Sequence, residues 1–222
     1  METLTRSIRT VTPGQRAGLF LLSALAVVIS YRYVDEWLAH SVMDFLKQMH
    51  LLAIGTRRIP DLLFPLVCLG TTAMWIAYFR LGRSGRDGVK RSFLLLAATA
   101  LPSAYLVKSF LQGIFGRVHT RTWLIHHGPP GFNWFGGGGG FPSGHMLVYT
   151  AFFAALWHYF PRYRIPSALA VFLLAAALIV TNYHFLSDII AGTYLGTIVT
   201  TAAGWFIRRF FAADGAAEGA SR

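Results

Sequence analysis

Residues 141–160 read FPSGHMLVYTAFFAALWHYF. This stretch contains no Asp, Glu, Lys or Arg, and its length is close to the roughly 20 residues that a helix needs to cross a bilayer. Ser143 is a natural N-cap, and Gly144 leaves the first helical turn unobstructed. Because backbone N–H groups and the positive end of the helix dipole point out of this end, the stretch predicts a membrane-spanning helix whose beginning can bind an anion. The alternative to an anion site is that these residues form an ordinary junction between a loop and a helix.

The composition of the whole chain also indicates a membrane protein. Of 222 residues, 55% are hydrophobic and 13% are charged, whereas soluble domains carry about 25% charged residues. The 20 Lys and Arg outnumber the 9 Asp and Glu. They lie in short clusters between apolar runs, whereas in a nucleic-acid binder they would form one face. Cys68 is the only cysteine, which excludes an intramolecular disulfide and a Cys-based metal site.

Five more apolar runs flank this stretch, and together they predict an all-α fold. Between the first two runs, residues 34–59 carry apolar side chains at helical spacing among polar ones, which predicts an interfacial amphipathic helix. We expect a six-span transmembrane helix bundle forming one domain over residues 1–211, followed by a disordered tail over residues 212–222. The predicted spans are residues 17–33, 60–79, 92–112, 143–160, 165–183 and 186–206.

The basic residues predict how the bundle is oriented. Clusters of Arg and Lys occur before the first span, between spans two and three, between spans four and five, and after span six. All of them fall on one side, which the positive-inside rule makes cytoplasmic, and both termini are on that side. The loop 113–142 and the turn at His184 then lie on the other side. With short loops and no sorting signal, we expect a bacterial inner membrane and a periplasmic site.

A second motif, HFLSD at residues 184–188, precedes the last span. His184 and Asp188 are four residues apart, which puts both side chains on the same face of a helix. An aspartate bonded to one ring nitrogen fixes the tautomer and leaves the other nitrogen free to attack phosphorus. His145, in the first turn of span four, can protonate a departing oxygen. A structural His–Asp pair is the alternative; a metal-binding pair is less favoured because no further carboxylate or cysteine cluster accompanies it.

Basic residues complete a set of groups suited to phosphate. Lys108 lies near the outer end of span three, and Arg117 and Arg121 follow in the outer loop. Fixed cations can bind phosphate oxygens and stabilise the charge that spreads over them in the transition state. Lys108 could instead extend to lipid headgroups, so Arg117 is the stronger candidate for direct contact.

Together, the six spans, the basic segment, residues 142–145 and the His-x3-Asp motif resemble the type 2 phosphatidic acid phosphatase family of membrane lipid phosphatases, over roughly residues 17–211. The resemblance implies a metal-independent enzyme that needs no cofactor and works through a phosphohistidine. It implies that His184 is the nucleophile, Asp188 its orienting partner and His145 the general acid. Ser143 and Gly144 would then bind the phosphate.

The first motif of this family is usually Lys-x6-Arg-Pro, and here the chain departs from it. Eight residues separate Lys108 from Arg117, and no proline follows the arginine. A second register, aligned on Arg117 in a Gly-Arg-Pro-Arg-Pro version, puts His119 at the second arginine and Gln112 at the lysine. Both registers stay open, and each gives a different set of substrate-binding residues.

The third motif departs as well. It usually begins with Ser-Arg, but Ala177 and Leu178 occupy those positions, so one phosphate-binding arginine is absent. His119, Arg121 or the arginine pair at residues 57–58 could take its place. Without a substitute, turnover would be slow or lost.

The expected function is hydrolysis of a lipid phosphate or pyrophosphate at the periplasmic face of the membrane. Candidate substrates are undecaprenyl pyrophosphate, phosphatidylglycerol phosphate, phosphatidic acid and lipid A phosphates, and nucleic acid is not an expected partner. Two alternatives stay open: a lipid phosphotransferase on the same scaffold, and a catalytically weakened protein that binds lipids.

Overall fold

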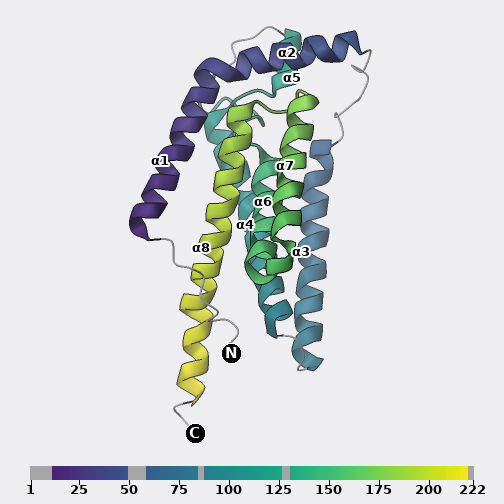
Figure 1. Cartoon of the computed structure of the whole chain (residues 1–222). Helices are drawn as coiled ribbons and strands as arrows, with labels where there is room; N and C mark the ends of the chain where they lie inside the picture. Colours follow the sequence, from purple (N-terminus) through teal and green to yellow (C-terminus); the bar gives the residue numbers. More distant parts are fainter. Residues whose placement is uncertain (1–11, 50–58, 85–87, 127–130, 220–222) are drawn as a thin grey trace.

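The computed structural model describes residues 12–49, 59–84, 88–126 and 131–219, and within these ranges all regular elements are helical (Figure 1). This confirms the all-α prediction for the described part of the chain. A π-helical turn, Ser30–Val34, joins α1 to α2, and a 3-10 turn, Pro161–Tyr163, precedes α7. The α-helices are α1 (Pro13–Ile29), α2 (Asp35–Gln48), α3 (Ile59–Ser84), α4 (Gly88–Phe115), α5 (Thr120–His126), α6 (Gly144–Tyr159), α7 (Arg164–Val180) and α8 (Leu186–Gly219).

Each predicted span coincides with one helix, namely α1, α3, α4, α6, α7 or α8. Five stretches of the described chain are long and apolar enough to cross a membrane, and they include all of these helices except α6. α6 has 16 residues. At 1.5 Å per residue its length is about 24 Å, whereas the hydrocarbon core of a bilayer is about 30 Å thick. By length and composition the described chain therefore has five candidate spans, with α6 as a shorter helix among them.

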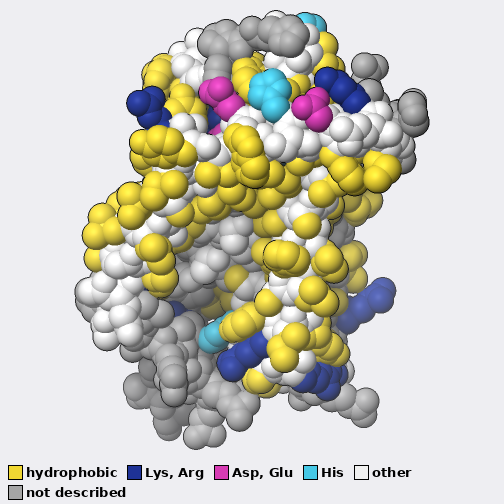
Figure 2. Space-filling view, turned by 45° about the horizontal axis from the view of Figure 1, so that its top comes forward, with side chains coloured by type: hydrophobic (Ala, Val, Ile, Leu, Met, Phe, Trp, Pro, Cys, Tyr) yellow, Lys and Arg dark blue, Asp and Glu magenta, His cyan; other side chains and the backbone are white. Residues whose placement is uncertain are grey.

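The flank of the bundle is apolar where it faces outward. Large hydrophobic side chains are exposed on several helices, including Leu22 of α1, Phe64 of α3 and Phe172 of α7. Figure 2 shows hydrophobic side chains across much of the flank on the face it draws, with Lys and Arg toward its two ends. An exposed apolar surface of this extent is typical of a protein whose flank faces lipid.

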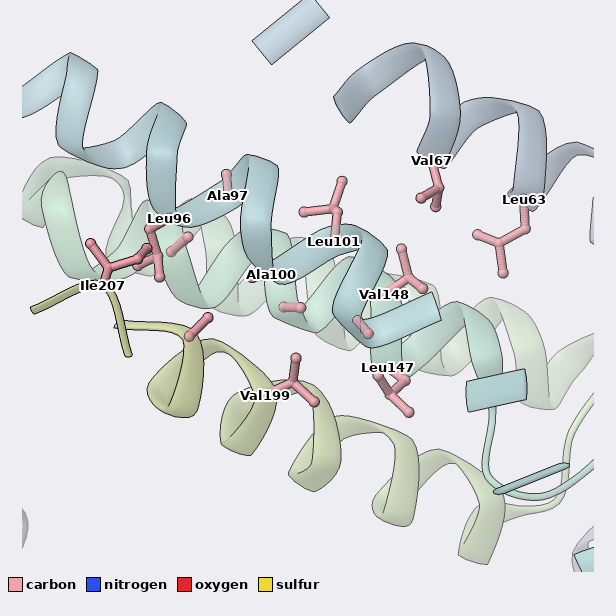
Figure 3. Close-up of a cluster of buried hydrophobic side chains, with 14 residues drawn as sticks. Leu63, Val67, Leu96, Ala97, Ala100, Leu101, Leu147, Val148, Val199 and Ile207 are labelled. Carbon is pink, nitrogen blue, oxygen red and sulfur yellow. The ribbon is translucent and has the colours of Figure 1, made fainter. Parts of the chain in front are cut away.

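α6 lies at the centre of the bundle, packed against α4, α7 and α8, and apolar side chains fill the space between α3, α4, α6 and α8 (Figure 3). α6 and α8 approach closely at two glycines. A Cβ at Gly192 would lie 2.6 Å from the Ser143 carbonyl oxygen, and one at Gly196 would lie 2.5 Å from that of Leu147. Small residues of this kind let helix backbones approach each other in membranes. The beginning of α6 is thereby fixed against the beginning of α8, where the Ser143 N–H donates to the Asp188 carbonyl at 3.0 Å.

α2 lies across the end of the bundle at which α8 begins (Figure 1). Its first residue, Asp35, is buried, and the Asn182 side chain donates to the Ala39 carbonyl at 3.3 Å. Ala39 also belongs to a buried apolar cluster with Phe185. α2 therefore covers the turn that carries His184.

Two sequence predictions concern segments that the structure describes only in part. α2 occupies part of residues 34–59, for which the sequence predicts an interfacial helix, and residues 50–58 lie outside the described part. α8 extends to Gly219, so the structure continues the helix into residues 212–222, for which the sequence predicts a disordered tail. Residues 220–222 lie outside the described part.

The contact between α6 and α8 can be tested by adding a single methyl group. Gly196→Ala places a Cβ against the Leu147 carbonyl, and we expect a loss of about 1–3 kcal/mol of stability from overpacking. Gly70→Ala is the matched control, because a Cβ at Gly70 on α3 meets no atom within 4 Å. Thermal unfolding of the purified protein in detergent measures both changes. Equal midpoints for the two variants would contradict the close contact.

Candidate active site

Histidines that are far apart in the sequence meet in a pocket at the beginning of α6. The ring centroids of His145 and His184 are 6.2 Å apart, and those of His119 and His184 are 5.2 Å apart. The pocket has a volume of about 90 Å³, enough for a few water molecules or a group of similar size. Its lining consists of Leu63, Lys108, Gln112, His119, Gly139, Gly144, His145, Tyr183 and His184.

The beginning of α6 has the capped structure that the sequence predicts. The Ser143 hydroxyl accepts a hydrogen bond from the Met146 N–H at 3.4 Å. A Cβ at Gly144 would lie 2.8 Å from Cε of Lys108, so a larger residue there would displace the lysine side chain. The lysine side chain therefore lies across Gly144 and lines the pocket beside the first turn of the helix, whose N–H groups suit an anion.

His184 is buried in the turn between α7 and α8. Its Nδ1 lies 3.6 Å from Oδ2 of Asp188, which also accepts the Phe185 N–H at 3.0 Å. Burial lowers the pKa of His184 to about 3, and the backbone carbonyl of Gly140 partly offsets this shift. The imidazole is therefore neutral near pH 7, and a neutral imidazole carries the lone pair that a nucleophile needs.

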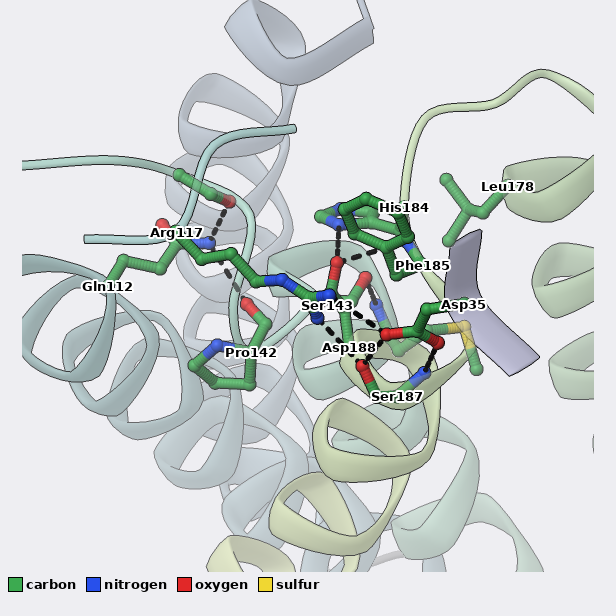
Figure 4. Close-up of polar contacts among 12 residues, drawn as sticks. Asp35, Gln112, Arg117, Pro142, Ser143, Leu178, His184, Phe185, Ser187 and Asp188 are labelled. Atoms are coloured by element: carbon green, nitrogen blue, oxygen red, sulfur yellow. Dashed lines mark hydrogen bonds and ion pairs between the residues drawn. The ribbon is translucent and has the colours of Figure 1, made fainter. Parts of the chain in front are cut away.

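Behind Asp188, the guanidinium of Arg117 joins two carboxylates (Figure 4). Its Nη1 donates to Oδ1 of Asp188 at 2.6 Å and to the Ser187 hydroxyl at 2.7 Å, and its Nη2 donates to Oδ2 of Asp35 at 2.9 Å. Asp35 in turn accepts the Ser187 N–H at 3.0 Å and the Ser187 hydroxyl. One carboxylate oxygen of Asp188 is thus held by Arg117 while the other faces His184.

Arg117 is enclosed on its other sides as well. It is 1% exposed, and it is absent from the lining of the pocket. The guanidinium carbon lies 4.1 Å from the ring centroid of Phe185, 5.1 Å from that of Tyr31 and 5.5 Å from that of Phe132. The sequence predicts that Arg117 touches the phosphate, whereas the structure places it beneath Asp188.

Residues from both possible alignments of the first motif line the pocket. Lys108 and Gln112 line it together, and the Gln112 Nε2 donates to the carbonyls of Gly139 at 2.6 Å and Pro142 at 3.0 Å. His119, at the second arginine position of the alternative register, lines the pocket too. The lysine of one register and the histidine of the other therefore face the same space.

Three candidates could replace the absent arginine of the third motif. Of these, His119 lines the pocket. Arg121 is half-buried on α5 and is absent from the pocket lining. Residues 57–58 lie outside the described part of the chain.

The glycine run at residues 136–140 packs against the backbone that carries Arg117 and His119. A Cβ at Gly138 would lie 2.7 Å from the Arg117 carbonyl oxygen, and one at Gly140 would lie 2.6 Å from that of Val118. The Gly140 N–H also donates to the Arg117 carbonyl at 2.8 Å. Only glycine permits two backbones to approach this closely. In the sequence this run is visible only as low complexity.

Asp35 is the residue that sequence reasoning misses. It is separated from Ser187 by 152 positions and lies outside every recognisable motif. Its one indication in the sequence is an acidic residue at the end of an apolar run, where a buried charge is costly unless it has a partner.

The pocket combines imidazoles, an ammonium group and the N-terminus of a helix, which together suit nucleophilic and general acid catalysis on a phosphate. Among the described residues, no group of three or more His, Cys, Asp or Glu side chains is arranged to hold a metal ion.

Comparison with known proteins points to the same chemistry. The model of the PAP2 superfamily matches residues 92–212. A lipid A 1-phosphatase of Rhizobium etli is 39% identical over 66 residues, which are 30% of this chain and 25% of that protein. A lipid A 1-phosphatase of Rhizobium johnstonii is 41% identical over 56 residues, which are 25% of this chain and 23% of that protein.

The alignments with these curated relatives span about a quarter of their length. No solved structure gives a significant match. The family match, in contrast, covers more than half of this chain and includes Lys108, His145, His184 and Asp188. The protein therefore belongs to the PAP2 superfamily, as its resemblance to the type 2 phosphatidic acid phosphatases predicts.

Proposed function

We propose that this protein hydrolyses lipid phosphates or pyrophosphates through a phosphohistidine on His184. The observation that carries the proposal is the meeting of His145 and His184 in one pocket at the beginning of α6, with ring centroids 6.2 Å apart. Because both rings line this pocket, a phosphoryl group bound there could contact a nucleophile and an acid together.

In the first step, N–H groups of the first turn of α6 and the Lys108 ammonium bind the phosphoryl oxygens. Ser143, which is buried and absent from the pocket lining, holds this turn in place, because its hydroxyl accepts the Met146 N–H and its own N–H donates to the Asp188 carbonyl. His184 attacks phosphorus through the ring nitrogen remote from Asp188, and the bond between phosphorus and the leaving oxygen breaks. His145 transfers a proton to that oxygen.

In the second step, water hydrolyses the phosphohistidine. His145 is now neutral and takes a proton from the water, whose oxygen attacks phosphorus and displaces the His184 nitrogen. Inorganic phosphate leaves, and both histidines return to their starting protonation states. Transfer to another lipid would require an acceptor hydroxyl in place of this water.

Asp188 orients His184 and stabilises the positive charge that develops on its ring during attack. Arg117 is a positioning residue in this scheme, because its contacts are with Asp188, Ser187 and Asp35. His119 takes the place of the absent arginine beside the phosphate. Its position in the pocket, 5.2 Å from the His184 ring centroid, supports this role.

The proposed membrane arrangement has six spans, with α6 as the fourth and α2 lying in the interface above the pocket. Basic residues support the orientation, since Arg83 lies in the last turn of α3, Lys90 in the first turn of α4 and Arg164 at the start of α7. These ends of the helices lie away from the pocket, so the positive-inside rule makes the pocket periplasmic in a bacterial inner membrane.

The names of the curated relatives favour a lipid A phosphate among the candidate substrates.

The nucleophile can be tested by removing its ring. His184→Ala should reduce release of inorganic phosphate by at least about 1,000-fold, because the proposed covalent intermediate forms on its ring nitrogen. His126→Ala, an exposed histidine at the end of α5, is the matched control and should keep full activity. Phosphate release from lipid A and from phosphatidic acid in detergent measures both. Turnover of His184→Ala within tenfold of the parent would refute the assignment.

The proposed chemistry needs no metal ion, so dialysis against EDTA should leave the rate of phosphate release unchanged. The rate before and after dialysis, and after addition of Mg²⁺ or Zn²⁺, gives the comparison. Loss in EDTA with recovery on adding a metal would replace the phosphohistidine mechanism with a metal-assisted one.

The contacts that hold Arg117 behind Asp188 can be tested at Asp35, which is the contact residue most distant from the proposed phosphate site. Asp35→Asn keeps the size of the side chain but removes one of the two carboxylates that Arg117 contacts. We expect kcat to fall about 10- to 100-fold with little change in KM, as for outer partners of other oriented histidines. Asp44→Asn, on the exposed face of the same helix, is the control. A purely structural Asp35 would instead lower the amount of folded protein while leaving kcat per folded molecule unchanged.

A further inference from the structure

A second, larger cavity lies between α6, α7 and α8, and it shares no lining residue with the candidate catalytic pocket. Its volume is about 620 Å³, within the range of roughly 300–1,000 Å³ that is usual for small-molecule sites. The cavity extends along α6 from Met146 to Tyr159. Its walls are largely apolar, with Phe153 and Trp157 on α6 and Phe172 on α7.

This groove exists because α7 and α8 both pack on α6 and, in the described chain, make no extensive contact with each other. Threonines at every fourth position of α8 form one wall. The hydroxyl of Thr193 donates to the Ile189 carbonyl at 2.8 Å, and that of Thr197 donates to the Thr193 carbonyl at 3.1 Å. Because these hydroxyls are satisfied within their own helix, the wall can border hydrocarbon without water.

The end of the groove that is remote from His145 is basic. His158 and Arg208 line it there, and Arg164 lies close by, with its guanidinium carbon 5.9 Å from the Trp157 ring centroid. No ion pair with a carboxylate is present at Arg164 or Arg208 within the described residues. His158 follows His145 by 13 positions in the same helix, which corresponds to about 20 Å.

From this pattern we infer that the groove binds an anionic phospholipid of the leaflet opposite the catalytic pocket. An acyl chain lies along the apolar walls, and the phosphate of the headgroup contacts Arg208 and His158. An apolar channel that ends in cations is complementary to such a lipid. The site is separate from the proposed catalytic one, because the headgroup lies about 20 Å along α6 from His145.

Binding of phosphatidylglycerol and of phosphatidylcholine to the full chain in detergent, measured by native mass spectrometry, tests this inference. We expect the parent protein to prefer phosphatidylglycerol. Arg208→Gln should weaken phosphatidylglycerol binding about fivefold, the effect of one basic residue at a lipid surface. Arg209→Gln removes the same charge from the neighbouring position, which does not line the groove, and should have little effect.

A second variant tests the apolar part of the groove. Ala168→Phe fills the space beside α7 and should weaken binding of phosphatidylglycerol without changing KM for the phosphate substrate. Equal effects of Arg208→Gln and Arg209→Gln would overturn the inference, since they would reflect overall charge. A raised KM in Ala168→Phe with unchanged phosphatidylglycerol binding would also overturn it, since the groove would then hold the substrate's own chain. Failure of the His184→Ala test would leave these lipid-binding measurements unaffected.

Discussion

The buried guanidinium of Arg117 is the contact on which the candidate site depends. It joins Asp35 at the start of α2 to Asp188 at the start of α8, and all three side chains are about 1% exposed or less. Removing the Arg117 charge would leave two carboxylates buried without a cation, and the loss of one partner of a buried ion pair commonly costs about 3–5 kcal/mol. The covering helix, the loop after α4 and the last helix are therefore tied together directly behind the proposed nucleophile.

A second constraint sets where the two proposed catalytic histidines lie. Gly192 and Gly196 let α8 approach the backbone of α6, so the beginnings of the two helices meet at the bond from Ser143 to Asp188. His145 follows Ser143 in one helix, and His184 precedes the other. Their separation of 6.2 Å is thus a consequence of helix packing rather than of flexible loops. Rigid elements hold catalytic groups more accurately than loops do.

Much of this could be predicted from the sequence because it follows from local patterns. Apolar runs predicted the helices, and the Ser-Gly-His segment predicted the capped start of α6. The spacing of His184 and Asp188 predicted their proximity, but His184 lies in the turn before α8 and does not share a helix with Asp188. The contacts of Arg117 could not be predicted, because its partner Asp35 is brought to it by the bend between α1 and α2. The presence of both Lys108 and His119 in the pocket depends on how the glycine run packs, and no spacing rule describes that contact.

A structure of the protein with orthovanadate bound would test the central claim most directly. Vanadate imitates the phosphoryl group in transfer, and the account predicts vanadium bonded to the His184 ring nitrogen, with oxygens facing the first turn of α6 and Lys108. Arg117 should keep its contacts with Asp35 and Asp188. Vanadate bound directly by Arg117, or bonded to a group other than His184, would contradict the proposed roles of these two residues.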